Sequence, residues 1–188
     1  SLSRGGFATI FHDNRDQFSL PSNASVFTAE LAAISSAVMI IKRMPPQKFI
    51  IYSDSRSAIE ALKSYHPKNS IVQQIKYSLH ELYEKGIDIQ ICWIPAHVGV
   101  KGNENADKAA KEAVNMIRSS ITIPIGDYLT MLKPLIIKKW QTMWVEEPNN
   151  NKLKEIKPSV SLWPSLTQKS THRGNTNTHP YRTYPLNT

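Results

Sequence analysis

The chain has 188 residues, of which 40% are hydrophobic and 20% are charged, and its net charge at pH 7 is +8. These values predict one globular domain with an extension and argue against a disordered chain. The single cysteine, Cys92, excludes an internal disulfide, and no apolar run reaches the roughly 18 residues that a membrane-spanning helix needs.

The first third of the chain predicts a β-hairpin followed by a helix. Three short strands are expected, over residues 6–11, 17–20 and 25–27, with a polar turn between the first two. Thr28 is the expected N-cap of the helix, because apolar residues then recur at close to helical spacing as far as Ile41. Pro45-Pro46 ends this helix.

The middle of the chain alternates apolar runs with helical patterns. Phe49–Tyr52 is a continuous apolar run, typical of a strand that is covered on both faces. Further expected elements are helices over 55–64 and 70–85, a strand over 87–93 and an alanine-rich helix over 103–118. This order predicts a mixed α/β layer fold. Cys92 is expected to be a buried thiol, in keeping with a reducing compartment and an intracellular location, nucleus or cytoplasm.

The character of the sequence changes after Arg118. We expect a domain over 1–118, a helical extension over 119–163 and a disordered tail over 164–188. Trp140 and Trp144 lie one helical turn apart in the extension, where they either pack into a core or stack on nucleic-acid bases. Much of the basic excess lies in this part, and a basic balance favours a polyanionic partner.

Two isolated acidic residues stand beside elements that are expected to belong to the core. Asp54 directly follows a predicted strand, and ligands bind at the carboxyl ends of strands in α/β sheets. The same position suits an N-cap of the next helix. Glu30 lies in the first turn of its helix, at the edge of the apolar stripe, where it serves either a site or the helix dipole. Alone, neither residue is specific.

The most specific stretch runs from Trp93 to Asp107, where a strand leads into a loop and then a helix. His97 lies in the loop, and nearby glycines make the loop mobile, which suits a residue that approaches a site and leaves it. A solvated histidine is the alternative. Asn103 and Asp107 share one helix face. Their alternatives are a helix cap for Asn103 and an exposed partner of a lysine for Asp107.

Three stretches together resemble one family: Phe-Thr-Ala-Glu-Leu at 27–31, Tyr-Ser-Asp-Ser at 52–55 and Trp-Ile-Pro-Ala-His-Val-Gly at 93–99. The last continues as His-x-Gly-x3-Asn-Glu-x-Ala-Asp, a string that transposases and proofreading exonucleases of the same layer fold lack. From about Ser1 to Ala113 the chain resembles type 1 ribonucleases H, in particular those of non-LTR retrotransposon reverse transcriptases. The resemblance implies a ribonuclease H-like α/β fold, with a mixed sheet flanked by helices and a C-terminal helical extension.

The resemblance also implies a reaction and its cofactors. The family cleaves the RNA strand of an RNA–DNA hybrid with two Mg²⁺ (or Mn²⁺) ions, which hard oxygen ligands suit. The catalytic and metal-binding positions carried over are Glu30, Asp54 and Asp107, with His97 as the mobile histidine; the nucleic-acid contacts carried over are Ser55, Arg56 and Asn103. The implied partners are the hybrid and an upstream reverse transcriptase domain of the same polyprotein, with no membrane partner.

The chain departs from the family at its beginning. The family starts with a strand that ends in Asp-Gly-Ser, whose Asp bridges both metals, and Ser1 corresponds to the Ser of that triplet. We therefore expect the chain to be an N-terminally truncated form without that Asp, because Asp13 and Asp16 fall in the hairpin turn. Metal affinity should fall, which puts the activity of this fragment in doubt. The neighbouring strand edges should also be exposed.

A second departure and the odd C-terminal part keep other functions open. Val26 and Phe27 stand where cellular ribonucleases H have asparagines that read 2′-hydroxyls, so recognition of RNA should depend more on backbone contacts and A-form shape. The alternative to an active retroelement-derived enzyme is a catalytically inactive nucleic-acid-binding module of the same fold. A purely structural interaction domain is a third interpretation, based on the aromatic residues of the extension.

Overall fold

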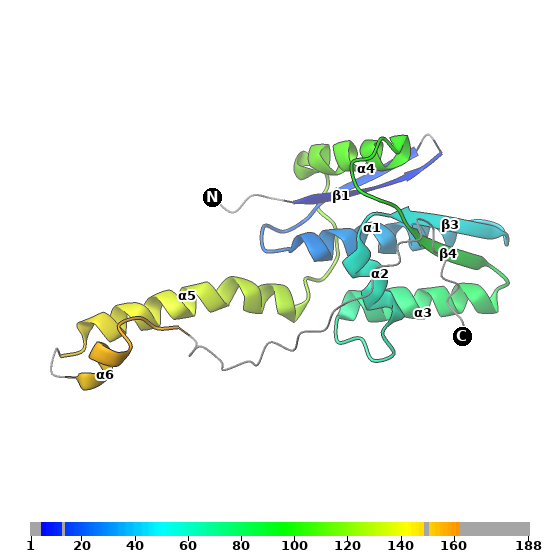
Figure 1. The fold of residues 1–188 in the computed structure, drawn as a ribbon. Helices are drawn as coiled ribbons and strands as arrows, with labels where there is room; N and C mark the ends of the chain where they lie inside the picture. The colour runs from blue at the N-terminus through cyan, green and yellow to red at the C-terminus, as the bar shows by residue number, and fades with distance from the viewer. Residues whose placement is uncertain (1–4, 13, 149–150, 162–188) are drawn as a thin grey trace, which may run out of the picture. The chain divides into compact units, whose positions relative to one another are not determined.

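The computed structural model describes residues 5–12, 14–148 and 151–161. Its elements in chain order (Figure 1) are β1 (Gly6–Phe11), β2 (Asn14–Ser19), α1 (Val26–Ile41), β3 (Lys48–Ser53), α2 (Arg56–Lys63), α3 (Ser70–Glu84), β4 (Asp88–Trp93), α4 (Lys101–Glu112), the 3-10 turn η1 (Ala113–Asn115), α5 (Ile125–Glu146) and α6 (Lys152–Ile156). The predicted α/β class, with helices flanking the strands, is confirmed. Among the described helices, none combines the length and the apolar character that crossing a membrane requires.

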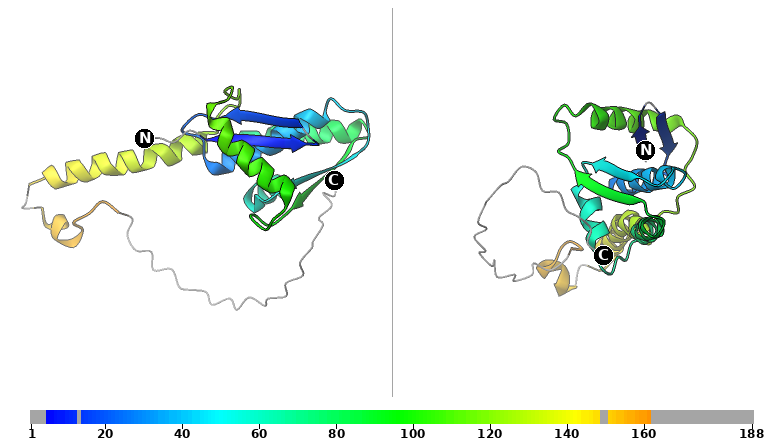
Figure 2. Two further views of the ribbon diagram at one scale, coloured as in Figure 1. Left: turned by 90° about the horizontal axis from the view of Figure 1, so that it is seen from above. Right: turned by 90° about the vertical axis from the view of Figure 1, so that its right-hand side faces the viewer.

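β1 and β2 form the predicted hairpin, an antiparallel pair in which Gly6 lies opposite Ser19. β2 begins at Asn14, earlier than predicted, so Asp16 lies in the strand opposite Thr9 and its predicted place in the turn is wrong. β1 packs against α1 and also against α4, so the hairpin lies between these two helices (Figure 2). The outer edge of β2 is partly covered at its end, because the Ser19 N–H donates to the carbonyl of Ile117 at 3.0 Å and the Ser119 N–H donates to the Ser19 carbonyl at 2.9 Å. These bonds connect the hairpin to the segment that follows η1.

α1 begins at Val26 with Ser25 as its N-cap, since the Thr28 N–H donates to Ser25 Oγ at 3.1 Å. The predicted strand over 25–27 and the predicted cap at Thr28 are therefore wrong, and Thr28 is buried in the first turn. Ser25 is held from outside the helix: its N–H and its hydroxyl each donate to the Asp127 carboxylate at 2.8 Å. The predicted apolar stripe of α1 is confirmed, because its members from Leu31 to Ile41 are buried.

β3 and β4 pair in parallel, and α1, α2 and α3 contribute to the core that covers one face of the pair. The prediction that β3 is covered on both faces is wrong. Ile50 and Tyr52 are 52% and 62% exposed, whereas Phe49 and Ile51 are buried, because the second face of β3 borders an open groove instead of a helix layer. Cys92 on β4 is also only partly buried, contrary to the expectation.

The four strands of the described part form two separate ladders, β1–β2 and β3–β4. The buried side chains divide in the same way. A small cluster under the hairpin contains Phe7, Leu20 and Ala32, and a larger one surrounds the β3–β4 pair; Ile121, which is partly buried, packs against both. A groove of about 380 Å³ is lined by β1 on one side and by β3 on the other. The strand edges that the sequence analysis expected to be exposed are those along this groove.

Residues up to Tyr128 form one compact unit, and a second begins at Leu129, within α5. Residues 119–128 thus group with the first unit, whereas the sequence analysis assigned them to the extension. Within the second unit, Trp144 is half-buried and its indole N–H donates to the Lys157 carbonyl at 3.0 Å. Trp140 is 58% exposed, so packing explains only one of the two tryptophans. The predicted tail, residues 164–188, lies outside the described residues.

Candidate active site

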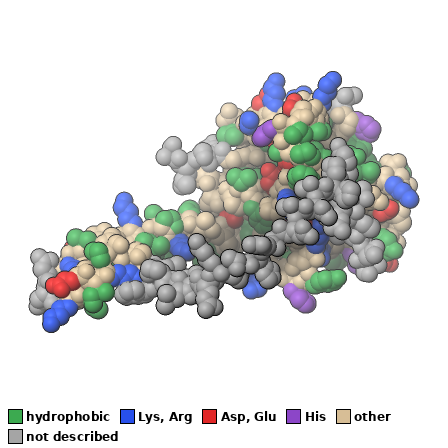
Figure 3. All heavy atoms as spheres, viewed as in Figure 1, with side chains coloured by type: hydrophobic (Ala, Val, Ile, Leu, Met, Phe, Trp, Pro, Cys, Tyr) green, Lys and Arg blue, Asp and Glu red, His purple; other side chains and the backbone are tan. Residues whose placement is uncertain are grey.

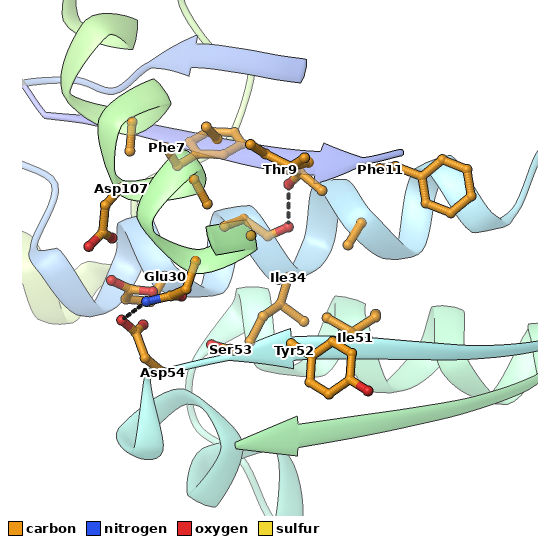
Figure 4. A pocket seen from close by; sticks show the side chains of 18 of the residues that line it. Phe7, Thr9, Phe11, Glu30, Ile34, Ile51, Tyr52, Ser53, Asp54 and Asp107 are labelled. Atoms are coloured by element: carbon orange, nitrogen blue, oxygen red, sulfur yellow. Dashed lines mark hydrogen bonds between the residues drawn. The ribbon is translucent and has the colours of Figure 1, made fainter. Parts of the chain in front are cut away.

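The three predicted carboxylates come from three different elements and line the same groove. Glu30 belongs to α1, Asp54 follows β3, and Asp107 lies on α4. Figure 4 shows the three side chains directed toward one another at one end of the groove. In the space-filling view, acidic side chains are visible in the hollow below α4 (Figure 3). Residues that are 77 positions apart in the chain therefore line one groove, in keeping with what the resemblance implies.

Asp54 is not the cap of α2, so the alternative interpretation of this residue is wrong. Ser55 is the N-cap, and its hydroxyl oxygen accepts from the Ala58 N–H at 3.4 Å. The Asp54 carboxylate is left to face the groove, where the Asn103 amide donates to its Oδ2 at 2.9 Å. The Trp93 indole N–H donates to the Asp54 backbone carbonyl at 3.1 Å. Because Ser55 caps α2, the Asp54 carboxylate is available for a ligand.

Asn103 does not cap its helix either. α4 begins earlier than predicted, at Lys101, and its N-cap, Val100, makes no side-chain capping bond. Asn103 therefore lies in the first turn, where its amide reaches across to Asp54. α4 also ends earlier than predicted, at Glu112. The chain after η1 leaves the helical path because it pairs with Ser19 of the hairpin. Asn103 and Asp107 both line the groove from α4, which confirms that they share a face.

Glu30 is partly buried, and the pKa of its carboxyl group is shifted. Burial raises the pKa of its carboxyl group above the usual value, and the negative charges of Asp54 and Asp107 raise this pKa further. No described side chain donates a hydrogen bond to Glu30 that would offset this effect. The site therefore holds Glu30 in a position that is unfavourable for its charged form, as expected of a carboxylate that serves a cation.

Replacement of Glu30 by Gln should stabilise the protein when no divalent cation is present. A raised carboxyl pKa means that the stability from Glu30 is complete below its unfolded value of about 4.5 and is lost as the pH rises through the folded pKa. Glu30→Gln should therefore raise the unfolding midpoint at neutral pH, and the gain should vanish below pH 4.5. The unfolding midpoint of both proteins is measured by calorimetry in the presence of a chelator, from below pH 4.5 to neutral pH. Glu84→Gln, at an exposed position, is the control. The same gain at every pH would contradict the explanation.

His97 lies at the rim of the site. Its side chain is 77% exposed, and its Nδ1 is 3.4 Å from Asp107 Oδ2, a pair that is ionic only when the imidazole is protonated. The backbone of His97 has a φ of 56°, which is unusual for a residue with a side chain, and Gly99 follows with a φ of 83°. The predicted loop thus brings an exposed histidine next to one of the carboxylates.

The predicted nucleic-acid contacts occupy the surface around the carboxylates. Arg56 is exposed in the first turn of α2, next to Asp54, whereas the Ser55 hydroxyl is engaged in capping. The sequence analysis missed the role of Trp93, which it considered only as part of a motif. A signal was available, because the strand register that pairs residue 53 with residue 93 brings this indole beside Asp54.

The donor set fits a divalent metal in its chemistry, although the described side chains do not form a complete cage. Carboxylate oxygens from three elements are the ligands that Mg²⁺ and Mn²⁺ prefer. Within the described ranges, no three His, Cys, Asp or Glu side chains lie close enough together to hold an ion as they stand. The carboxylates are thus placed around one region without enclosing it, and the open groove adjoins them.

Comparison with known proteins agrees with this geometry. The family model described as RNase H matches residues 2–115. The chain is 31% identical over 105 residues to ribonuclease H1 of Mus musculus, 30% identical to that of Rattus norvegicus, and 28% identical over 104 residues to that of Homo sapiens. Each match covers 50% of this chain and 36% of the relative, so the matched region is about a third of each relative's length. Because the family match covers more than half of the sequence, the chain belongs to the ribonuclease H family.

Proposed function

We propose that this chain is the ribonuclease H part of a protein that hydrolyses the RNA strand of RNA–DNA hybrids. The observation that carries the proposal is the convergence of Glu30, Asp54 and Asp107, from α1, the end of β3 and α4, on one end of a groove. Three carboxylates gathered in a partly buried region need a counter-charge, and family membership supports a phosphodiester hydrolase that uses divalent ions.

Each side chain of the site has a role in this proposal. Glu30, Asp54 and Asp107 would hold two Mg²⁺ or Mn²⁺ ions, which when bound would polarise the scissile phosphate and activate water. Asn103 fixes the orientation of the Asp54 carboxylate through its amide. His97, exposed beside Asp107, can accept or deliver a proton at the rim and move away with its loop.

The surroundings of the carboxylates suit a polyanionic duplex. Arg56 is exposed next to Asp54, and Lys108 and Lys111 are exposed on α4, over which basic side chains are visible in Figure 3. These cations can contact the phosphates of the hybrid on either side of the cleavage position. In the proposed complex they determine where the hybrid lies, and they carry no sequence preference.

We further propose a retroelement origin for the chain, on the strength of the motifs at 27–31, 52–55 and 93–99. An upstream reverse transcriptase domain of the same polyprotein, and action in the nucleus or cytoplasm, belong to this proposal. The resemblance implies a further strand that ends in Asp-Gly, and the edges of β1 and β3 along the groove could both pair with it. Without the Asp of that strand, the three described carboxylates would bind two divalent ions weakly.

One observation favours an alternative function, a nucleic-acid-binding module that does not cut. In the part of the chain that the structure describes, the carboxylates do not form a ready-made metal-binding group. The basic surface would remain useful without them, since contacts with phosphates need no metal. The two functions differ in one measurable property, namely whether bound hybrid is hydrolysed when divalent ions are supplied.

The decisive test is cleavage of an end-labelled RNA–DNA hybrid in Mg²⁺ and in Mn²⁺. The chain as given is assayed beside a version extended at its N-terminus by an apolar strand that ends in Asp-Gly. We expect the extended protein to cut the RNA strand, leaving 3′-hydroxyl and 5′-phosphate ends, with all activity lost in EDTA and little activity in the shorter chain. If both proteins bound the hybrid and neither cut it, the binding module would be the correct function.

A further inference from the structure

Asp54 lies in a short turn between a strand and a helix. The preceding residue, Ser53, is the last of β3, and the following residue, Ser55, is the N-cap of α2. The β3–β4 pair ends beside this turn, where the Ile94 N–H donates to the Ser53 carbonyl at 3.0 Å. Asp54 itself belongs to neither element, so the direction of its carboxylate depends on the contacts that hold the turn.

Side chains from two distant elements hold Asp54. The Trp93 indole N–H, from the end of β4, donates to its backbone carbonyl at 3.1 Å. The Asn103 amide, from α4, donates to its carboxylate at 2.9 Å. The same backbone carbonyl also accepts from the Arg56 N–H at 3.0 Å, but this bond is local and moves with the turn. Within the described ranges, Trp93 is therefore the only side chain bonded to the backbone of Asp54.

Burial alone does not explain where the Trp93 ring lies. The side chain is 53% exposed, so core packing contributes little to holding it, and its N–H has water within reach as an alternative partner. Tryptophan has few rotatable bonds, so a bond from its ring costs little side-chain entropy and fixes the acceptor firmly. β4 leads directly into the loop that carries His97. The indole therefore connects the start of this loop to the turn that carries Asp54.

We propose that Trp93 is a positioning residue for Asp54: its indole N–H fixes the turn so that the carboxylate faces Asn103 and the groove. Trp93 acts through Asp54, and the proposal rests on the proposed function only in taking Asp54 as a metal ligand. The direction of the carboxylate is a property of the metal-free protein. Without the indole bond the turn samples other orientations, and the net contribution of one such bond corresponds to about a three- to tenfold change in an equilibrium.

The first test follows the Asn103 side-chain amide by NMR in the 188-residue protein, in the presence of a chelator. Asp54→Ala gives the chemical shifts of this amide when its acceptor is absent. We expect Trp93→Phe to move the shifts toward those of Asp54→Ala. Trp140→Phe is the matched control, because its ring is exposed to a similar degree, 58%, and belongs to the second unit, and it should leave the shifts unaltered. Unaltered Asn103 shifts in Trp93→Phe would overturn the proposal.

A second variant separates the N–H from the bulk of the ring. Replacement of the Trp93 indole by benzothiophene keeps two fused rings and has sulfur in place of the N–H. We expect it to move the Asn103 shifts in the same direction as Trp93→Phe does. If the benzothiophene protein kept the unaltered shifts while Trp93→Phe moved them, the ring would act by its volume, and the proposal would be wrong.

The last measurement is the affinity for Mn²⁺, titrated into each protein and followed by the broadening of NMR signals near the carboxylates. We expect affinity about three- to tenfold weaker in Trp93→Phe and unaltered in Trp140→Phe. A purely structural role would lower the free energy of unfolding and leave the Mn²⁺ affinity of the folded protein unaltered, which would overturn the proposal. If the unaltered protein bound no Mn²⁺ at the carboxylates, the proposed function would fail, whereas the Asn103 shifts would still decide whether Trp93 positions Asp54.

Discussion

Asp54→Asn is expected to lower hybrid cleavage about 1000-fold in the protein extended by a strand that ends in Asp-Gly. The variant keeps the shape of the side chain and its contact with Asn103, but it removes the negative charge from the region that Glu30 and Asp107 share. The measurement is the initial rate of cleavage of a labelled hybrid at saturating Mg²⁺.

The control for this variant is Asp88→Asn, at the opposite end of the β3–β4 ladder from Asp54. It removes the same charge without touching the groove, so its cleavage rate should match that of the unaltered extended protein. Binding of the hybrid should be nearly unchanged in both variants, because the exposed lysines and Arg56 are intact. If Asp54→Asn cleaved the hybrid at the unaltered rate, the assignment of Asp54 to the active site would be wrong.

Gly6→Ala is expected to destabilise the protein by about 1–3 kcal/mol, the usual cost of overpacking a core. A Cβ at Gly6 would lie 2.6 Å from the carbonyl oxygen of Ala110 and 2.7 Å from the Cβ of Ala113. Since the first of these atoms belongs to the backbone, the strand and the end of α4 would have to separate. The free energy of unfolding, measured by urea denaturation, checks this.

Gly5→Ala is the matched control, because a Cβ at Gly5 meets no atom within 4 Å. Its stability should be close to that of the unaltered protein. Gly6→Ala should in addition weaken cleavage by the extended protein, since α4 carries Asp107 and packs on β1 through this contact. An unaltered stability of Gly6→Ala would show that the hairpin and α4 are not tightly packed at this point.

Periodic patterns in the sequence predicted most elements well, because they depend on burial within one element. The helices α2 and α3 and the strand β4 lie within one residue of their predicted bounds. The predicted site residues could be brought together only through the resemblance to ribonucleases H, since nothing in the local sequence of Glu30 or Asp107 specifies a common groove. Their roles in catalysis stay predictions.

The sequence analysis failed where a partner distant in the chain decides the local structure. Ser25 and Thr28 are both common caps by residue type, and Asp127, 102 residues from Ser25, binds Ser25 at the start of the helix. Asp54 and Ser55 compete in the same way, and the Asn103 amide draws Asp54 toward the groove. The apolar run of β3 predicted two covered faces, but coverage of a face depends on which other elements pack on it, and no pattern within β3 reveals that.

The two hydrogen bonds between Ser25 and Asp127 connect the helix that carries Glu30 to a residue outside the family match. Asp127 lies 12 residues beyond the last residue of the family match, yet its carboxylate accepts hydrogen bonds from the N–H and the hydroxyl of Ser25, the N-cap of the helix that carries Glu30. The segment beyond the family match therefore helps to hold the beginning of this helix. A protease cut or a splice junction placed at the family boundary would remove the Asp127 acceptor from Ser25, one turn before Glu30, a proposed metal ligand.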